Sequence, residues 1–163
     1  MTNILNLFKF IAKQEPQYKV PFGLELKQKV KDTPELVTDD DWRTAGGDID
    51  ISNSKITSLP DNLTVNGYLN CYNTQITSLP DNLTVNGTLN LGNTPIRSLP
   101  NNLTVGGTLN LAGSRIEVLP NNLTISLGFL DLRNTSLARI YTRDQIRQKL
   151  EAAGGKIDGD IEI

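Results

Sequence analysis

A ten-residue segment returns at a fixed interval of 20 residues through the middle of this 163-residue chain. Ser58–Gly67 is identical in sequence to Ser78–Gly87, and close variants of the same segment begin at Ser98 and Val118. A short constant period is typical of a solenoid, in which each unit buries its apolar residues only against the neighbouring units. Proteins of this architecture usually act through a long exposed surface, so the repeat constrains function as well as fold.

Every unit contains a short stretch in which apolar and polar residues alternate. Leu89 and Leu91 are separated by one polar residue, a pattern that predicts a strand with one buried face. Pro100 excludes a helix interior from the return side of the coil, so we expect an extended chain or a single 3₁₀ turn there. The same frame predicts six parallel strands, at residues 48–52, 68–72, 88–92, 108–112, 129–133 and 159–163. The residues expected in the core of the middle coils are Leu89, Leu91, Ile96, Leu99, Leu103, Val105, Leu109 and Leu111.

The repeats occupy only the middle of the chain. Residues 47–137 form the predicted solenoid, residues 1–46 a helical N-terminal cap, and residues 138–163 a C-terminal cap helix followed by the last strand. We expect caps because an array of repeats needs a cover over each open end of its core. The alternative for the N-terminal part is a helix that binds a partner or a membrane surface.

Local signals support helices in both flanking parts. Apolar residues recur at helical spacing over residues 3–14, and a second helical stretch covers residues 23–31. Near the C-terminus, Thr142 and Gln145 have the spacing of a capping box, which predicts a helix that continues to Ala153.

The composition argues against an enzyme. Histidine is absent and Cys71 is the only cysteine, which removes the commonest general base, most zinc sites and any intrachain disulfide. No phosphate-binding loop, metal-ligand spacing or nucleophile–base pair is found. We therefore expect no catalytic residues, no metal and no cofactor.

Charge and hydropathy indicate the compartment and the class of partner. The chain has 16 basic and 18 acidic residues, a balance that gives no overall attraction to nucleic acid or to anionic membranes. The N-terminus lacks the basic region of a secretory signal, and no apolar run reaches the roughly 20 residues that span a bilayer. The sequence predicts a soluble cytoplasmic protein.

The repeat also resembles a known family. The pattern Leu-x-Leu-x-x-(Asn/Thr)-x-(Ile/Leu), followed by Leu-Pro, is similar to a leucine-rich repeat, and the 20-residue period is most similar to the short bacterial type. It covers the segments Leu69–Ile76, Leu89–Ile96, Leu109–Ile116 and Leu130–Leu137. The resemblance implies an α/β solenoid with one parallel sheet of about six coils, whose exposed strand face binds other macromolecules. It also suggests a bacterial, phage or giant-virus origin.

Two departures distinguish this chain from the usual repeat. Hydroxyl residues stand where the family has its turn asparagine, so any buried ladder must run through Thr74, Thr94, Ser114 and Thr135. Val65, Val85 and Val105 lie four positions ahead of the first strand leucine, where the usual spacing is three. Both a variant leucine-rich coil and a regular β-solenoid are compatible with this spacing.

Three further motifs have structural explanations. Asn62-Leu63-Thr64 and its copies match a glycosylation sequon, but they recur at one position of every coil and indicate a turn. Cys71 replaces an inward leucine and is expected to be a buried apolar filler. The Asp39–Asp41 run beside Trp42 is expected to cap a helix rather than to bind a cation.

The candidate binding surface is the set of outward positions on the predicted strands. Tyrosine and other aromatic residues dominate interface energetics, so exposed aromatic side chains are the predicted anchors. Acidic residues outnumber basic ones five to one on this face, which favours a partner with a basic patch. The candidate partner-binding residues are Tyr68, Asn70, Tyr72, Asn90, Asn110, Phe129, Asp131 and Arg133. The alternative is structural: the asparagines form a solvated amide ladder and the tyrosines cover a neighbouring coil.

Three functions remain open at this point. The first is a small protein-binding module that acts by stoichiometric contact and occupies or inhibits a larger target, in the host cytoplasm if the protein is phage-encoded. The second is a structural protein whose solenoid ends associate into a homo-oligomer. The third is carbohydrate binding on the face that carries Tyr68, Tyr72 and the asparagines.

Overall fold

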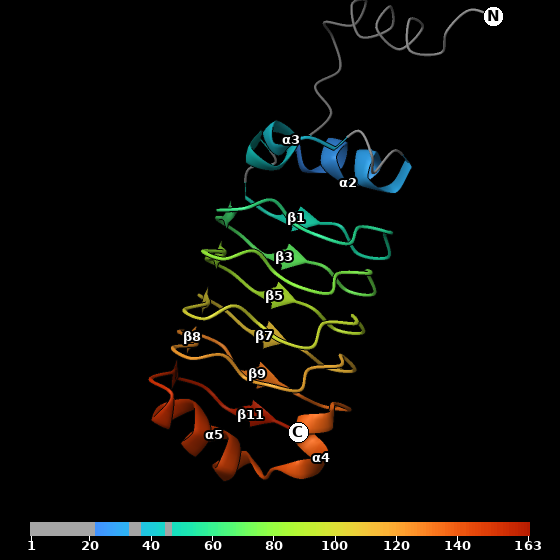
Figure 1. Cartoon of the computed structure of the whole chain (residues 1–163). Coiled ribbons are helices and arrows are strands. Elements are labelled where there is room, and N and C mark those ends of the chain that lie inside the picture. The colour runs from blue at the N-terminus through green and yellow to red at the C-terminus, as the bar shows by residue number, and fades with distance from the viewer. Residues whose placement is uncertain (1–21, 33–36, 45–46) are drawn as a thin grey trace, which may run out of the picture.

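The computed structural model describes residues 22–32, 37–44 and 47–163, and it shows a column of stacked coils (Figure 1). One strand of each coil joins a six-stranded parallel sheet, here called sheet A. In spatial order its strands are β1 (Ile49–Asp50), β3 (Leu69–Asn70), β5 (Leu89–Asn90), β7 (Leu109–Asn110), β9 (Leu130–Asp131) and β11 (Ile161–Glu162). All six predicted strands are present, but each contains two residues where five were expected.

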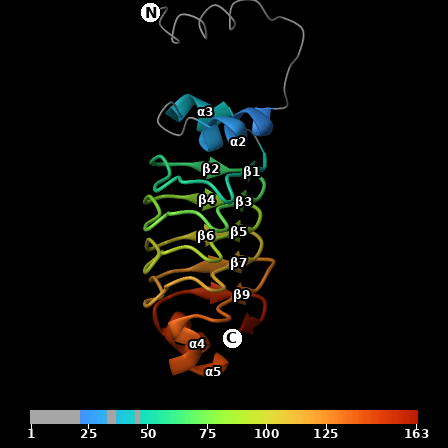
Figure 2. The same cartoon turned by 90° about the vertical axis from the view of Figure 1, so that its right-hand side faces the viewer.

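A second parallel sheet, sheet B, runs along the same column (Figure 2). Its strands are β2 (Thr64–Val65), β4 (Thr84–Val85), β6 (Thr104–Val105), β8 (Thr124–Ile125) and β10 (Lys156–Ile157). The return side of the coil is therefore a paired strand rather than only an extended chain or a 3₁₀ turn. The chain is a parallel β-solenoid with two sheets.

The number of regular coils is smaller than predicted. About four turns have the 20-residue period, with Leu69 paired to Leu89 and Leu89 to Leu109. Leu109 pairs with Leu130 because the fourth repeat carries one extra residue. The next turn is enlarged by two helices, α4 (Ser136–Ile140) and α5 (Arg143–Ala152), and β11 only begins another. The expectation of about six coils was wrong because it counted strands and not complete turns.

The core consists of the inward residues of both sheets. All eight residues predicted for the middle coils are at most 7 % exposed, and six of them, including Leu89 and Leu91, are at 0 %. Cys71 is also fully buried, as expected for a filler. A column of buried hydroxyls accompanies the leucines: Ser54, Thr74, Thr94, Ser114 and Thr135.

Four of these five hydroxyls form hydrogen bonds within their own coils, whereas the Ser114 hydroxyl has no partner among the described residues. The Thr74 hydroxyl donates to the Cys71 carbonyl at 2.8 Å, and the Thr94 hydroxyl donates to the Leu91 carbonyl at 2.6 Å. The predicted ladder of hydroxyls is thus present as a stacked column, but its hydrogen bonds do not run from coil to coil. Each bond satisfies a carbonyl at the end of the sheet A strand, where the chain leaves the sheet.

Asparagine holds two corners of each coil. Asn73 and Asn93 have φ values of 55° and 56°, in the left-handed region that asparagine tolerates better than most residues, and Gly113 takes the same position with φ 69°. The other corner contains Asn62 and Asn82, the first residues of the sequons, with φ values of 57° and 60°. A structural role in turns therefore accounts for the repeated sequons.

A column of glycines allows the coil backbones to touch. A Cβ atom added to Gly87 would lie 2.6 Å from the Gly67 carbonyl oxygen, and one added to Gly159 would lie 2.1 Å from that of Gly128. Real Cβ atoms do not approach backbone so closely, so only glycine fits this corner. Gly107 donates its N–H to the Gly87 carbonyl at 2.9 Å, which continues the stack.

Two helices lie beyond β1 (Figure 1). They are α2 (Phe22–Asp32), which confirms the stretch predicted at 23–31, and α3 (Asp39–Thr44). Leu26, Val30 and Trp42 are buried in the same apolar cluster as Ile49. Asp41 accepts hydrogen bonds from the Thr38 N–H and hydroxyl, both at 2.7 Å. The helix predicted over residues 3–14 lies outside the described residues.

The far end of the column carries α5, with the predicted capping box of Thr142 and Gln145. Its Arg147 guanidinium donates to the carbonyls of Ile157 and Gly159, at 3.2 and 2.8 Å. In the regular coils the equivalent carbonyls accept N–H groups of the next coil, as when Gly106 donates to Val85 at 2.8 Å. Arg147 thus takes the place of a further coil. None of the described helices is long and apolar enough to cross a membrane.

Candidate functional site

The outward face of sheet A carries two exposed tyrosines on one strand. Tyr68 and Tyr72 flank β3 and are 42 % and 39 % exposed, whereas Leu69 and Cys71 between them are fully buried. Successive side chains of a strand point to opposite faces, so both rings lie on the outer side of the sheet. This is the orientation that the sequence predicted.

Tyr72 is held in place by the next coil. Its Cδ2 atom lies 3.2 Å from the point where a Cβ atom on Gly92 would be, so the ring covers Gly92. The Asn93 side-chain amide donates to the Tyr72 hydroxyl at 2.8 Å. Part of the alternative interpretation is therefore correct, since Tyr72 does cover a neighbouring coil. An aromatic group fixed in this way also loses less conformational entropy when a partner binds it.

The three candidate asparagines serve the backbone of their own coils. The Oδ1 atoms of Asn70, Asn90 and Asn110 accept the N–H of the residue two positions ahead, at 3.2, 3.0 and 2.9 Å. Asp50 and Asp131 occupy the same column and accept the same bond, each at 3.0 Å. The amide oxygens are thus used, and the nitrogens of these half-buried side chains are what a partner can reach.

Asp131 at the end of β9 and Arg133 two residues later form a compact charged pair. Arg133 Nη2 lies 2.7 Å from Asp131 Oδ2 and Arg133 Nε lies 3.3 Å from Glu162 Oε2. The Asp131 side chain is only 2 % exposed. Burial opposes its charged form, but the hydrogen bonds from the Arg133 side chain and backbone outweigh this and hold the pKa of Asp131 below its usual value.

The structure brings the candidate residues together in two groups. The first contains Tyr68, Asn70, Tyr72, Asn90 and Asn110, on the neighbouring strands β3, β5 and β7. The second contains the half-buried Phe129 with Asp131 and Arg133, at β9. Three strand spacings separate β3 from β9, which corresponds to about 14 Å.

The acidic excess of this face is smaller than the sequence suggests. Asp50 forms an ion pair with Lys27 of α2, and both Asp131 and Glu162 pair with Arg133. Arg133 is already the one base in the five-to-one ratio, so the base that the repeat pattern does not reveal is Lys27. Five acids then stand against two bases, and the charge argument for a basic partner is weaker but keeps its sign.

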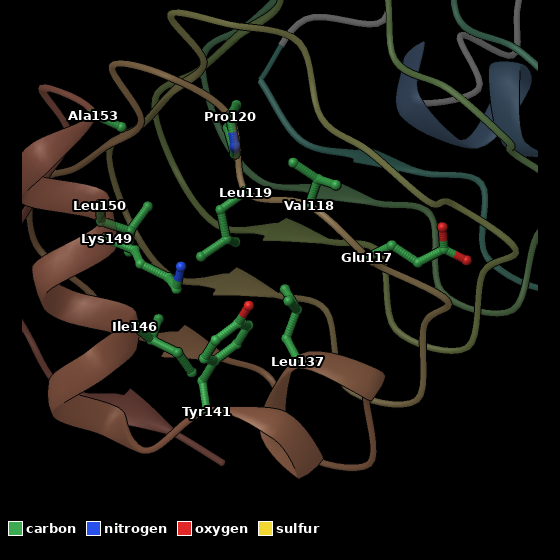
Figure 3. A pocket seen from close by; sticks show the side chains of 10 residues that line it. All are labelled: Glu117, Val118, Leu119, Pro120, Leu137, Tyr141, Ile146, Lys149, Leu150 and Ala153. Atoms are coloured by element: carbon green, nitrogen blue, oxygen red, sulfur yellow. The ribbon is translucent and has the colours of Figure 1, made fainter.

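Sequence reasoning missed a groove at the end of the solenoid that carries α4 and α5. A cavity of about 350 Å³ lies between the fourth return segment and these two helices (Figure 3). Val118 lies on its edge with 63 % of its surface exposed. The available signal was that Val118 replaces the serine found at Ser58, Ser78 and Ser98.

Neither a metal site nor a reactive thiol is found in the described part of the chain. No group of three or more His, Cys, Asp or Glu side chains among the described residues has the geometry of a metal site. Burial raises the pKa of the Cys71 thiol far above its ordinary range, so this thiol is not a nucleophile near neutral pH. What the sheet A face offers is therefore contact area and hydrogen bonds.

Comparison with protein-family models, with curated proteins and with solved structures finds no match to this chain. The resemblance to leucine-rich repeats therefore depends on the sequence motif, while the two-sheet solenoid depends on the structure itself.

Proposed function

We propose that this protein is a non-enzymatic binding module that contacts another protein through the outward face of sheet A. The observation that carries the proposal is the tyrosine pair on β3, with both rings exposed and on one face. Tyrosine is enriched among the residues that dominate binding energy, because its ring buries a large area and its hydroxyl can form a hydrogen bond.

The surface beside the tyrosines suits a protein partner. On the next two strands the same columns hold small side chains: Thr88, Gly92, Thr108 and Ala112. The tyrosines therefore stand at the edge of a flat area without long charged side chains. A partner can bury apolar atoms against that area and pair polar groups with the Nδ2 atoms of Asn70 and Asn90.

The wider proposal is a variant leucine-rich-repeat protein of bacterial or phage origin that occupies its target stoichiometrically in the cytoplasm. The motif and the 20-residue period support the family, although the second sheet differs from the coil that the resemblance implies. In the same proposal α2, α3 and α5 act as end caps, since each contributes buried apolar residues or hydrogen bonds to the terminal coils.

The two alternatives are less well supported by the geometry. In an oligomer built through the β10 end of sheet B, the last coil would need free carbonyls at Ile157 and Gly159, but Arg147 donates to both. A sugar on the asparagine column could accept from the Nδ2 atoms, but the Oδ1 atoms already accept backbone N–H groups and offer it little as acceptors.

Affinity capture with matched variants tests the proposal. Wild-type protein, the double variant Tyr68→Ala/Tyr72→Ala and a sheet B control, Thr64→Ala/Thr104→Ala, would each be immobilised and exposed to lysate of the native host. The expected result is a protein retained by the wild type and by the control but not by the tyrosine variant. The double change should weaken binding by about 2 kcal/mol or more if the tyrosines are hot spots. Equal retention by all three folded proteins would remove the site from sheet A.

A further inference from the structure

The groove beside α5 has an apolar floor. Leu137 and Ile146 are buried side chains at its base, and Leu119 is only half-buried, although its counterparts Leu79 and Leu99 are 8 % and 7 % exposed. Figure 3 shows these side chains around one space, with Val118 on the side of the return segment. Pockets of a few hundred Å³ with apolar walls and few polar groups are typical binding sites.

The repeat pattern is broken at this groove in a way that its own packing does not need. Three coils place a serine at the position of Val118, and those coils are as well packed as the fourth. Val118 exposes 63 % of its surface, so the substitution places apolar area in water without filling the core. An exposed apolar residue beside an apolar groove indicates a surface that another molecule covers.

Two polar groups point into the same space. Lys149 Nζ lies 4.7 Å from the centre of the Tyr141 ring, and in Figure 3 the lysine amine and the tyrosine hydroxyl are both directed into the cavity. Among the described residues, no carboxylate forms an ion pair with Lys149 and no hydrogen bond reaches the Tyr141 hydroxyl. An ammonium and a hydroxyl over an apolar floor fit a carboxylate attached to an apolar group.

The groove continues past these two residues. A second hollow of about 310 Å³ is lined by Tyr141 and Lys149 again, together with Gln145 and Gln148 of α5. The Gln148 side-chain amide can pair with both N–H and C=O groups of an extended backbone, while Gln145, whose Oε1 atom accepts from the Thr142 N–H, can donate from its Nε2 atom. The two hollows adjoin at Tyr141 and Lys149, and together they are longer than a single small acid requires.

We propose that this groove binds an extended peptide of a partner protein, in which an apolar side chain is followed within one or two residues by a carboxylate. The apolar side chain enters the hollow formed by Val118, Leu119, Leu137 and Ile146. The carboxylate pairs with Lys149 and Tyr141, and the peptide backbone continues over Gln145 and Gln148. This site is separate from the sheet A face and does not depend on it.

Selection from a displayed library of random linear peptides tests the proposal on the full chain. We expect the wild-type protein to enrich peptides with an apolar residue next to Asp or Glu. The selected peptide, labelled and titrated by fluorescence anisotropy, should bind Lys149→Glu roughly fivefold or more weakly, and Val118→Ser more weakly as well. Val118→Ser restores the residue of the other coils, so its fold should be intact.

Two controls separate the groove from general surface effects. Lys55→Glu makes the same charge change on the first coil, and Leu127→Ser removes a leucine that is 90 % exposed outside the groove. Both should bind the peptide as the wild type does, and so should Tyr68→Ala/Tyr72→Ala. Failure to enrich any such peptide, or equal binding by Lys149→Glu, would overturn the proposal. The proposal would also be overturned if 4-methylpentanoate shifted the backbone amide NMR signals of the groove while no peptide bound, because that result assigns the groove to small acids.

Discussion

Replacing Arg147 with methionine should destabilise the protein without touching its apolar core. The guanidinium forms two hydrogen bonds to carbonyls of the last coil, at 3.2 and 2.8 Å. Bonds to charged groups contribute about 1.5–3 kcal/mol each when buried, but these are part-buried and water can replace them in the variant. We therefore expect a loss of about 2 kcal/mol in the free energy of unfolding, or a Tm lower by roughly 4–8 °C.

Urea denaturation followed by circular dichroism measures this loss, with Arg115→Met as the matched control. Arg115 is exposed on the solenoid, so its replacement should change stability by less than about 0.5 kcal/mol. The stability loss of Arg147→Lys should fall between those of Arg147→Met and Arg115→Met, because one ammonium lacks the planar geometry that lets a guanidinium reach two carbonyls. Should Arg147→Met be as stable as Arg115→Met, the guanidinium is not substituting for the next coil.

Three further perturbations follow from the described contacts. Leu91→Ala, at a fully buried position, should cost about 2–5 kcal/mol in urea denaturation, and a loss under 1 kcal/mol would show that the coil is not tightly packed there. The pKa of Asp131 is depressed in the folded protein, so the stability that this carboxylate contributes is complete above the unfolded pKa near 4 and is lost as the pH falls through the folded pKa. The difference in free energy of unfolding between wild type and Asp131→Asn should therefore shrink below about pH 4. A difference that stays constant down to pH 2 would contradict this. Deleting residues 1–40 removes Leu26 and Val30 from Ile49 and should cause aggregation in light scattering, whereas a monomeric variant with an unchanged Tm would identify the segment as an interaction arm.

The sequence predicted what repeats along the chain. The alternation around Leu89 and Leu91 placed the inner residues of sheet A correctly, and the capping box placed the start of α5. Sheet B was missed although Leu63 and Val65 alternate with a polar residue as the sheet A leucines do, because the Leu-Pro dipeptide and the resemblance to leucine-rich repeats favoured an unpaired return segment. Helix α4 was missed because its five residues complete little more than one turn.

Contacts between the repeats and the flanking helices could not be predicted from the sequence of a single repeat. The groove exists because α4 and α5 fold back onto the fourth return segment, a contact between parts of the chain without a shared pattern. Ion pairs such as Lys27 with Asp50 likewise join the repeats to a flanking helix. Only the serine-to-valine change at Val118 pointed to the groove in the sequence.

The structure also limits which positions on the outward face of sheet A can vary to suit a partner. Sheet A has three outward columns, and the middle one is Asp or Asn in the first five coils because its Oδ1 atom holds the backbone at the end of each strand. Replacing that residue would remove a hydrogen bond that the coil itself needs, and not only a contact with a partner. In one outer column Asp48, Thr88 and Thr108 also accept a backbone N–H of the next coil. The tyrosine side chains of the two outer columns accept no backbone N–H among the described residues, and these columns vary from tyrosine to threonine, glycine and alanine. Specificity can therefore change at Tyr68 and Tyr72 with little cost to the fold, and these positions are where a binding face on this solenoid is free to evolve.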